Sequence, residues 1–307
     1  MKSSQVGKVD KNQASIEPTQ WRQRGELITL GGHQIFVIDE GPAEAPLLLL
    51  IHGFPTSSWD WAPMWPSLTE KFRVIAMDLL GFGYSDKPDH RRYTIHGQAD
   101  LVEDLVRHKQ LQQFHVLAHD YGDTVAQELL ARQNEEVGAG RWLSCCFLNG
   151  GLFPETHRPL LTQKLLLSPL GPLINKLLGF SQFEKKFSSV FGTNTQPSKA
   201  ELMAFWEIIN FNDGKHMFHN LITYLRDRKQ HRSRWVKALQ ESKVSLALIN
   251  GSVDPISGAH MVARYKELKC RLDYLAELSS IGHYPQVEDC YSVSNHYIKF
   301  LQQLILD

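Results

Sequence analysis

The chain alternates short apolar runs with stretches of helical periodicity, and this alternation restricts its fold more than any other feature. Runs such as Leu47–Ile51 and 142–148 are largely apolar, which is typical of strands covered on both faces of a sheet. Apolar stripes at helical spacing lie between the runs, for example over residues 101–106. Strands that alternate with helices predict an α/β fold with a mostly parallel, doubly wound sheet, here of eight strands. We expect the strands at residues 27–30, 34–38, 47–51, 73–77, 115–118, 142–148, 244–249 and 272–278.

The alternation breaks between about residues 151 and 242, where strand signals are few. Residues 197–201 contain a capping box, in which Ser198 caps a helix and Glu201 reaches back to it. The Asn-Asp-Gly sequence at 212–214 predicts a turn that ends this helix. The pattern therefore predicts a helical cap inserted into a sheet domain. The expected boundaries are 1–21 for a polar extension, 22–151 and 243–307 for the two parts of the sheet domain, and 152–242 for the cap.

Composition excludes some classes of partner. The 33 basic residues balance the 33 acidic ones, so no global field favours a nucleic acid or an anionic membrane. No secretion signal is visible, and the leucine-rich stretch at 160–180 is interrupted by lysines and prolines. This favours water-soluble cap helices over a membrane span and predicts a cytoplasmic location without membrane attachment. Cys145 and Cys146 lie in an apolar run, which predicts buried thiols in a reducing compartment.

Residues 114–126 predict a strand, a tight turn and a helix, with Asp120 at the turn. Ala118 and Gly122 lie two residues before and after it, and small residues there permit the sharp turn called a nucleophile elbow. A carboxylate on this turn predicts alkylation of the enzyme, whereas a serine would be acylated. The alternative is that Asp120 only caps the following helix.

Two further polar residues follow predicted strands. Asp254 comes after the strand at 244–249, and His283 comes after the strand at 272–278. Because the carboxyl ends of parallel strands open onto one crevice, we expect Asp120, Asp254 and His283 to lie close together. Their order along the chain is the order expected of a nucleophile–acid–histidine triad.

The Asp120 turn, the loop at 52–58 and the ordered Asp254 and His283 resemble the α/β-hydrolase family. An aspartate as the nucleophile resembles the epoxide hydrolase and haloalkane dehalogenase branch of that family. The resemblance covers about residues 22–307. One animal member of the family has an apolar N-terminal segment that this sequence does not contain. This difference again argues against membrane attachment. The segments that resemble this member more closely are 52–58, 119–123, 149–151, 153–161 and 283–286.

The resemblance implies a mechanism in which the Asp120 carboxylate attacks an electrophilic carbon and forms an alkyl ester. His283 then activates water for attack on the ester carbonyl, and Asp254 holds the imidazole tautomer. Backbone N–H groups of Phe54 and Tyr121 are expected to form the oxyanion hole. This chemistry requires no cofactor and no metal. The expected partner is a small, apolar substrate that carries an epoxide or a halide, and the oligomeric state is left open.

The leaving group separates the two alternatives. Dehalogenases of this type place a tryptophan directly after the nucleophile, and here that position holds Tyr121. Epoxide hydrolases use cap tyrosines as acids, and the predicted cap contains Tyr224. We therefore predict an epoxide hydrolase-like enzyme in which Tyr121 and Tyr224 form the acid pair and Trp206 binds substrate. A haloalkane dehalogenase that uses the Trp206 indole and a non-catalytic ligand receptor or scaffold remain as alternatives.

A basic run occupies residues 226–237 of the predicted cap. The simplest interpretation is a solvated helix, and the alternative is a landing site for an acidic substrate or a lipid headgroup. Residues 155–158 predict either a salt-bridge network at the hinge of the cap or a position for Arg158 near the substrate.

Overall fold

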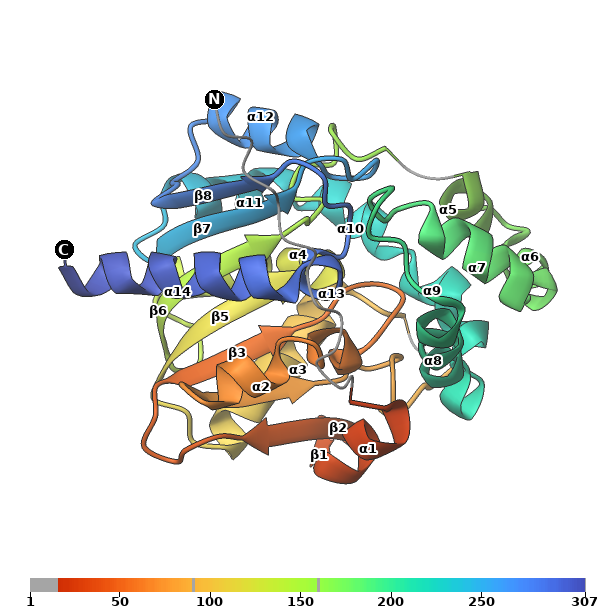
Figure 1. Cartoon of the computed structure of the whole chain (residues 1–307), viewed down its shortest axis with the longest axis horizontal. Coiled ribbons are helices and arrows are strands. Elements are labelled where there is room, and N and C mark those ends of the chain that lie inside the picture. The colour runs from red at the N-terminus through yellow and green to blue at the C-terminus, as the bar shows by residue number, and fades with distance from the viewer. Residues whose placement is uncertain (1–15, 90–91, 159–160, 307) are drawn as a thin grey trace, which may run out of the picture.

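The computed structural model describes residues 16–89, 92–158 and 161–306, and an eight-stranded sheet forms its centre (Figure 1). The strands are β1 (Glu26–Leu30), β2 (His33–Glu40), β3 (Leu47–Ile51), β4 (Arg73–Met77), β5 (Gln113–His119), β6 (Arg141–Leu148), β7 (Ser245–Gly251) and β8 (Tyr274–Leu278). Their order in the sheet is β1-β2-β4-β3-β5-β6-β7-β8. β2 pairs antiparallel with β1 and β4, and the other neighbouring strands are parallel. The predicted α/β fold with a mostly parallel sheet is therefore confirmed.

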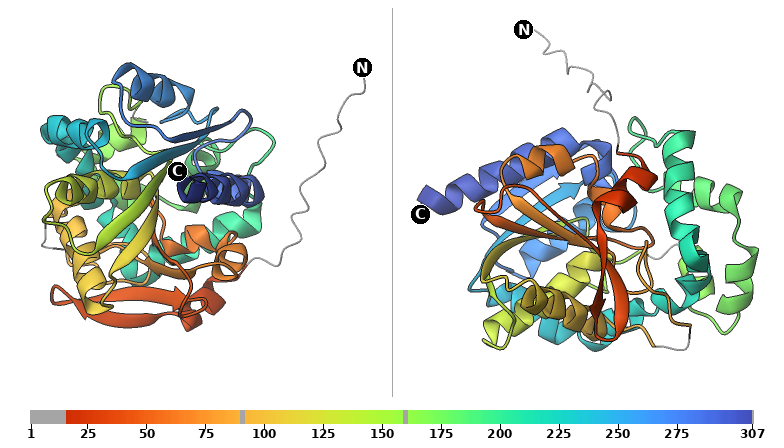
Figure 2. Two further views of the ribbon diagram at one scale, coloured as in Figure 1. Left: turned by 90° about the vertical axis from the view of Figure 1, so that its left-hand side faces the viewer. Right: turned by 90° about the horizontal axis from the view of Figure 1, so that it is seen from below.

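Helices cover both faces of the sheet, which explains why its central strands are apolar on both sides. The helices around the sheet are α1 (Pro18–Arg24), η1 (Ser58–Trp61), α2 (Trp65–Thr69), α3 (Ile95–His108), α4 (Tyr121–Asn134), α11 (Arg232–Gln240), α12 (Ala259–Glu267), α13 (Pro285–Glu288) and α14 (Cys290–Leu306). α3, α4 and α11 lie along one face, and α2 and α14 lie along the other (Figure 2). Between these layers Leu48 and Leu50 of β3 are fully buried, as are the free thiols of Cys145 and Cys146 in β6.

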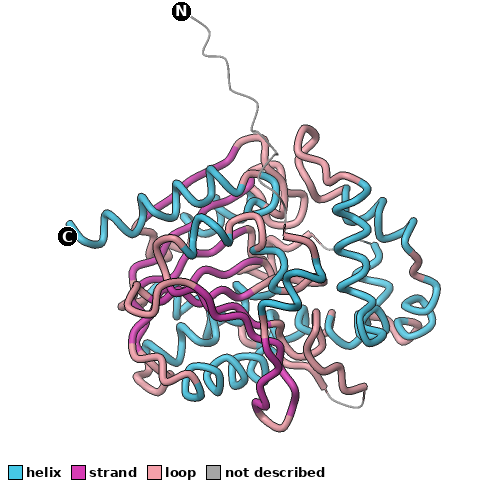
Figure 3. Tube along the Cα trace, turned by 60° about the horizontal axis from the view of Figure 1, so that its bottom comes forward, coloured by secondary structure: helices cyan, strands magenta, loops and turns pink. Residues whose placement is uncertain are grey.

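Between β6 and β7 the chain forms a group of helices beyond the carboxyl ends of the strands (Figure 3). We call these helices the cap; they are α5 (Leu161–Leu166), α6 (Gly171–Leu177), α7 (Phe180–Ser188), α8 (Lys199–Asn210), η2 (Phe211–Met217), α9 (Phe218–Leu221) and α10 (Tyr224–Gln230). The predicted capping box begins α8: the Ser198 N–H donates to Glu201 Oε2 at 2.7 Å, and the Glu201 N–H donates to Ser198 Oγ at 3.2 Å. Left-handed backbone at Asn212 and Asp213, with φ of 50° and 56°, turns the chain after this helix.

α11 lies inside the range predicted for the cap but packs along α4 of the sheet domain instead. The indole N–H of Trp235 on α11 donates to Glu128 Oε2 on α4 at 2.9 Å, and Arg234 forms ion pairs with Glu128 and Glu135. The prediction of a solvated helix is therefore wrong at Arg234, because α4 neutralises its charge. Lys237 on the same helix is solvated, with 68 % of its side chain exposed.

The connection from β6 into the cap is held by ion pairs. Glu155 accepts hydrogen bonds from Arg232 of α11 and from Arg264 of α12. These bonds lower the pKa of Glu155 to about 2, with the Arg232 guanidinium as the main cause. Residues 155–158 thus contain a salt-bridge network, and Arg158 is exposed.

Candidate active site

Asp120 occupies the sharp turn between β5 and α4, in a backbone conformation that is rare for a residue other than glycine. Its φ is 45° and its ψ is −101°, and its N–H donates to the Leu148 carbonyl at 3.2 Å. Gly122 permits the turn, because a Cβ at this position would lie 2.3 Å from the carbonyl oxygen of Ile51. Close packing of α4 against β3 therefore holds Asp120 in a strained conformation at the carboxyl end of the sheet.

Asp254 and His283, the other predicted members of the triad, lie beside Asp120. His283 Nδ1 is 2.8 Å from Asp254 Oδ2, and His283 Nε2 is 3.9 Å from Asp120 Oδ1. Asp254 also accepts hydrogen bonds from the Asn149 side chain and the Ile256 N–H, at 3.0 and 2.7 Å. Because these donors fix the Asp254 carboxylate, the imidazole is held with Nε2 toward Asp120.

The two oxygens of the Asp120 carboxylate have different surroundings. Oδ2 accepts a hydrogen bond from the Phe54 N–H at 3.1 Å. Oδ1 lies 3.9 Å from His283 Nε2 and 3.7 Å from Arg228 Nη2. The Tyr121 N–H is the first amide of α4, and its place in an oxyanion hole stays a prediction. One carboxylate oxygen is thus held by the backbone, and the other faces charged side chains.

The charges of the site are coupled. Burial raises the pKa of Asp120, but His283 and Arg228 outweigh this effect and bring the pKa below its ordinary value. Burial lowers the pKa of His283, whereas the carboxylates of Asp254 and Asp120 raise it, and the result is a pKa of about 9. At neutral pH the site therefore holds a protonated imidazole between two ionised carboxylates.

Arg228 on α10 is a site residue that the sequence prediction missed. Its Nε donates to Thr124 Oγ1 at 2.8 Å and its Nη2 donates to the Asp120 carbonyl at 3.2 Å. The guanidinium carbon lies 4.5 Å from the centroid of the Tyr224 ring, which is a cation–π contact. The prediction of a solvated helix is wrong here, since the Arg228 side chain is only 1 % exposed. The available signal was helical spacing, because Arg228 falls one turn after Tyr224, on the buried face of α10.

His157, in the connection into the cap, is a second residue that the prediction did not place in the site. Burial lowers its pKa to about 4, and Arg228 and His283 contribute in the same direction. The Asp120 charge acts on His157 in the opposite direction, so this imidazole shares the electrostatic environment of the site. His157 is therefore a neutral hydrogen-bonding group at neutral pH.

A cavity of about 120 Å³ opens on Asp120 and His283. Its wall is mostly apolar and comes from cap helices α5, α7, α8 and α9 as well as from the loops after β3 and β8. Trp206 on α8, predicted to bind substrate, lines this wall. The cavity can therefore hold a small apolar molecule with a reactive carbon against Asp120.

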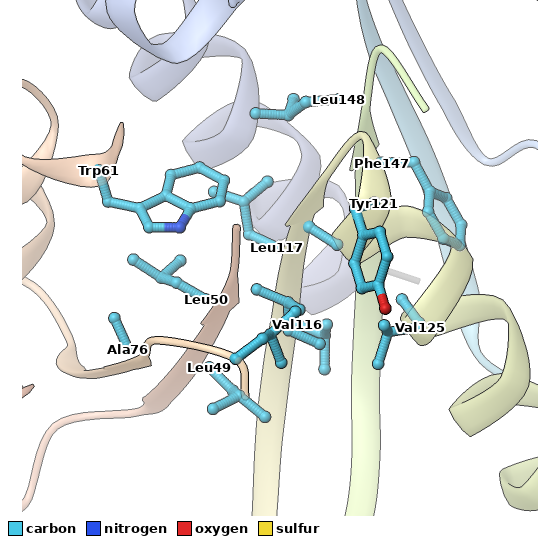
Figure 4. Close-up of a cluster of buried hydrophobic side chains, with 14 of the residues drawn as sticks. Leu49, Leu50, Trp61, Ala76, Val116, Leu117, Tyr121, Val125, Phe147 and Leu148 are labelled. Carbon is cyan, nitrogen blue, oxygen red and sulfur yellow. The ribbon is translucent and has the colours of Figure 1, made fainter. Parts of the chain in front are cut away.

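The predicted acid pair, Tyr121 and Tyr224, does not line this cavity. Tyr121 lies among the buried apolar side chains with its hydroxyl directed toward Val125 (Figure 4). Tyr224 is equally buried and packs against Tyr121, with ring centroids 4.8 Å apart. Tyr121 begins α4 on the side of the helix that packs into the core, so its hydroxyl does not line the cavity, and the acid pair stays a prediction that the cavity does not support.

The chain matches the family described as alpha/beta hydrolase fold over residues 46–289. It is 43 % identical to the mesoderm-specific transcript protein of Mus musculus over an alignment of 290 residues. The alignment covers 92 % of this chain and 87 % of that protein. It is 37 % identical over 271 residues to a Mycobacterium tuberculosis protein that carries the name of a hydrolase, LipZ, with 88 % and 92 % covered. A loop variant of haloalkane dehalogenase from Bradyrhizobium elkanii shares the fold, with a TM-score of 0.77 at 20 % identity over 92 % of this chain and 97 % of that one. The chain belongs to the α/β-hydrolase family.

Proposed function

We propose that this chain is a hydrolase that forms a covalent alkyl ester on Asp120, and that epoxides are its class of substrate. The proposal rests on the surroundings of the Asp120 carboxylate. Oδ2 accepts the Phe54 N–H at 3.1 Å, and Oδ1 lies 3.9 Å from His283 Nε2. Oδ1 is thus available as a nucleophile beside a histidine that Asp254 orients. The mostly apolar cavity at the same atoms favours an uncharged electrophile.

In the first step Asp120 Oδ1 attacks a ring carbon of the epoxide in line, and the opposite carbon–oxygen bond breaks. The carboxylate becomes a neutral ester, and the opened oxygen takes up the negative charge. The ester no longer carries the negative charge that raised the pKa of His283, so this pKa falls. The His283 imidazolium then donates its proton to the opened oxygen. This leaves His283 neutral, which is the form that acts as a general base.

In the second step His283 takes a proton from water, and the resulting hydroxide attacks the ester carbonyl carbon of Asp120. The oxyanion develops on Oδ2, where the Phe54 N–H donates. Collapse of the tetrahedral species releases the diol. The two protons of the water end on the diol oxygen and on His283, so the carboxylate and the imidazolium are both restored.

Arg228 supports the proposal as a positioning residue. A carboxylate as buried as Asp120, at 3 % exposure, tends to take up a proton, which would abolish its nucleophilicity. The guanidinium 3.7 Å from Oδ1 favours the ionised form and fixes the Asp120 backbone through its carbonyl. We therefore propose that Arg228 keeps the Asp120 carboxyl group ionised.

A haloalkane is the second candidate substrate, and the position of Trp206 on the cavity wall favours it. An indole N–H there would stabilise a departing halide. Epoxides rank first because the residue directly after the nucleophile is Tyr121, whose buried side chain offers no second donor to a halide.

Substitution His283→Gln tests the proposal, since it removes the base of the second step and lets the ester accumulate. The variant is incubated with a panel of epoxides and a panel of haloalkanes, and the mass of the peptide that contains Asp120 is measured. We expect an added mass equal to the whole epoxide, because ring opening loses no atoms and water can protonate the opened oxygen. A haloalkane would add its mass less that of the hydrogen halide.

The matched control is His283→Gln combined with Asp120→Asn, which should carry no adduct. An adduct on a residue other than Asp120 would contradict the proposed nucleophile. The absence of any adduct from both panels would refute the proposal and favour a non-catalytic ligand receptor.

A further inference from the structure

The outer surface of the cap carries a group of exposed leucines. Soluble proteins rarely gather large apolar side chains on their surface without a function. These leucines come from α5, α6 and the residue directly before α6, and the two helices pack against each other at the end of the cap farthest from the sheet (Figure 1). The leucine patch, as we call it, consists of residues that are 39 % to 70 % exposed: Leu161, Leu165, Leu170, Leu173 and Leu177.

Helix geometry explains why the leucines of α6 face outward. On α6 the inner side is set by Gly171, where a Cβ would lie 2.2 Å from the backbone of α5, and by Asn175, whose side chain donates to the Lys215 carbonyl at 2.8 Å. Successive residues of an α-helix are about 100° apart, so residues two positions later lie about 200° away. Leu173 and Leu177 stand two positions after Gly171 and Asn175, and the fold therefore turns them away from the protein.

Exposed lysines accompany the leucine patch. Lys164 lies on α5, Lys176 on α6, and Lys185 and Lys186 on α7. Residues 161–190 hold these four lysines and one acidic residue. Within the ranges that the structure describes, none of the four forms an ion pair, whereas Arg234 of α11 pairs with Glu128 and Glu135. A chain with balanced overall charge thus has a locally positive cap surface.

The composition of this surface indicates its partner. Tight contacts between proteins are enriched in tryptophan, tyrosine and arginine, and leucine and lysine are under-represented there. Leucines flanked by lysines on short amphipathic helices are instead typical of segments that lie in the interface of an anionic bilayer. No helix in the described part of the chain is long and apolar enough to cross a bilayer, so the contact would be with its surface.

The cavity that ends at Asp120 reaches the same helices. Leu166 of α5, Leu178 directly after α6 and Lys186 of α7 all line it. An apolar molecule held in a bilayer against the cap would therefore meet an apolar wall close to the point where it leaves the lipid. The leucine patch and the wall of the cavity thus belong to the same short helices of the cap.

We infer that the leucine patch and its lysines dock the cap on the surface of an anionic lipid membrane, from which an apolar substrate enters the cavity. The balanced net charge led us to expect no attraction to an anionic membrane. A net charge is a sum over the whole chain, however, and does not show that the cap surface is locally positive. Docking requires no chemistry at Asp120. A failure of the proposed hydrolysis and a failure of docking are therefore distinguishable.

Co-sedimentation of the full chain with lipid vesicles tests the inference. The probes are vesicles of phosphatidylcholine alone and vesicles that also contain phosphatidylserine. We expect stronger binding to the anionic vesicles, and weaker binding to them at high salt. The variant Leu173→Gln/Leu177→Gln should lose about tenfold or more in partition coefficient. The variant Lys164→Glu/Lys176→Glu should lose at least about fivefold for each lysine, on anionic vesicles only.

Two matched controls lie outside the cap. Leu27 on β1 is 57 % exposed, as is Leu173, so Leu27→Gln removes an equally exposed leucine. Lys71 is an exposed lysine before β4, so Lys71→Glu makes the same charge change elsewhere. Both controls should bind vesicles as the wild type does, and circular dichroism should show all variants folded.

Three results would overturn the inference. The first is a wild-type chain that does not sediment with anionic vesicles. The second is equal binding by Leu173→Gln/Leu177→Gln and by Leu27→Gln. The third is a wild-type dimer in light scattering that the leucine variant converts to a monomer, which would make the leucine patch an interface between copies of the chain.

Discussion

Replacement of Asp254 by asparagine should lower the pKa of His283, and the structure gives the size of the change. Burial disfavours the charged imidazole, yet the carboxylates of Asp254 at 2.8 Å and Asp120 at 3.9 Å raise its pKa to about 9. In Asp254→Asn only the more distant Asp120 carboxylate and a smaller contribution from Glu288 oppose burial. We expect the pKa of His283 to fall to about 6.5 or lower, a loss of roughly 3 kcal/mol in the stability of its charged form.

The same shift makes folding stability depend on pH. The pKa of His283 is about 9 in the folded protein and about 6.5 in an unfolded chain. The contribution of this group to the free energy of unfolding is therefore complete below about pH 6.5 and is lost as the pH rises through about 9. In Asp254→Asn this dependence should vanish. Wild type and variant should consequently differ less in stability at about pH 9.5 than at about pH 6.

Nuclear magnetic resonance of labelled histidine rings measures the pKa, and the His283 signal is assigned by its absence in His283→Gln. Urea unfolding at the two pH values, followed by tryptophan fluorescence, measures the stability. The matched control is Asp273→Asn, because Asp273 accepts the Leu246 N–H at 2.8 Å at the opposite end of the sheet. This control should leave the pKa of His283 unchanged. A wild-type pKa near 6.5, or a pKa near 9 in Asp254→Asn, would refute the reasoning.

Three further predictions concern the packing and the charges around the site. Gly122→Ala should cost roughly 1–3 kcal/mol in the free energy of unfolding, since its Cβ would lie 2.3 Å from a β3 carbonyl; a stable variant would contradict the close approach of α4. Leu117→Ala should lower the free energy of unfolding by about 2–5 kcal/mol because Leu117 is fully buried. The control Leu27→Ala, at an exposed leucine, should change it by no more than about 0.5 kcal/mol. Equal losses in urea unfolding would contradict the position of Leu117 in the core. Arg228→Met removes the cation beside Asp120 and should raise the pKa of Asp120, so ester trapping in the His283→Gln background should weaken more steeply below neutral pH than in His283→Gln alone. Equal pH profiles of trapping with and without Arg228 would contradict that role for Arg228.

The strands were predictable because each is a local pattern. A run such as β3 is apolar at every position, and the continuous pattern reports burial on both faces without reference to any other segment. The turn at Asp120 was equally local, since the small residues Ala118 and Gly122 that permit it stand two positions away. The capping box at Ser198 and the turn at 212–214 are of the same kind.

The positions of individual side chains in the site were harder to predict. Tyr121 stands next to the nucleophile in the sequence, yet its ring points into the core because the first turn of α4 packs on the sheet. Arg228 belongs to a run of basic residues that predicts a solvated helix, yet on α10 its side chain is buried and lies beside Asp120. Trp235 and Arg234 likewise belong to α11. Its position in the sequence predicted that this helix is part of the cap, but in the structure it packs against α4.

By itself, the sequence determined the eight-stranded fold and the order of Asp120, Asp254 and His283, because strand ends in a parallel sheet meet at one edge whatever the loops contain. Only the tertiary structure decided which charges surround the Asp120 carboxylate and which leucines of the cap face outward. Those outcomes depend on how each helix is rotated against its neighbours. Rotation follows from the packing of the whole core, and no local stretch of sequence contains that information.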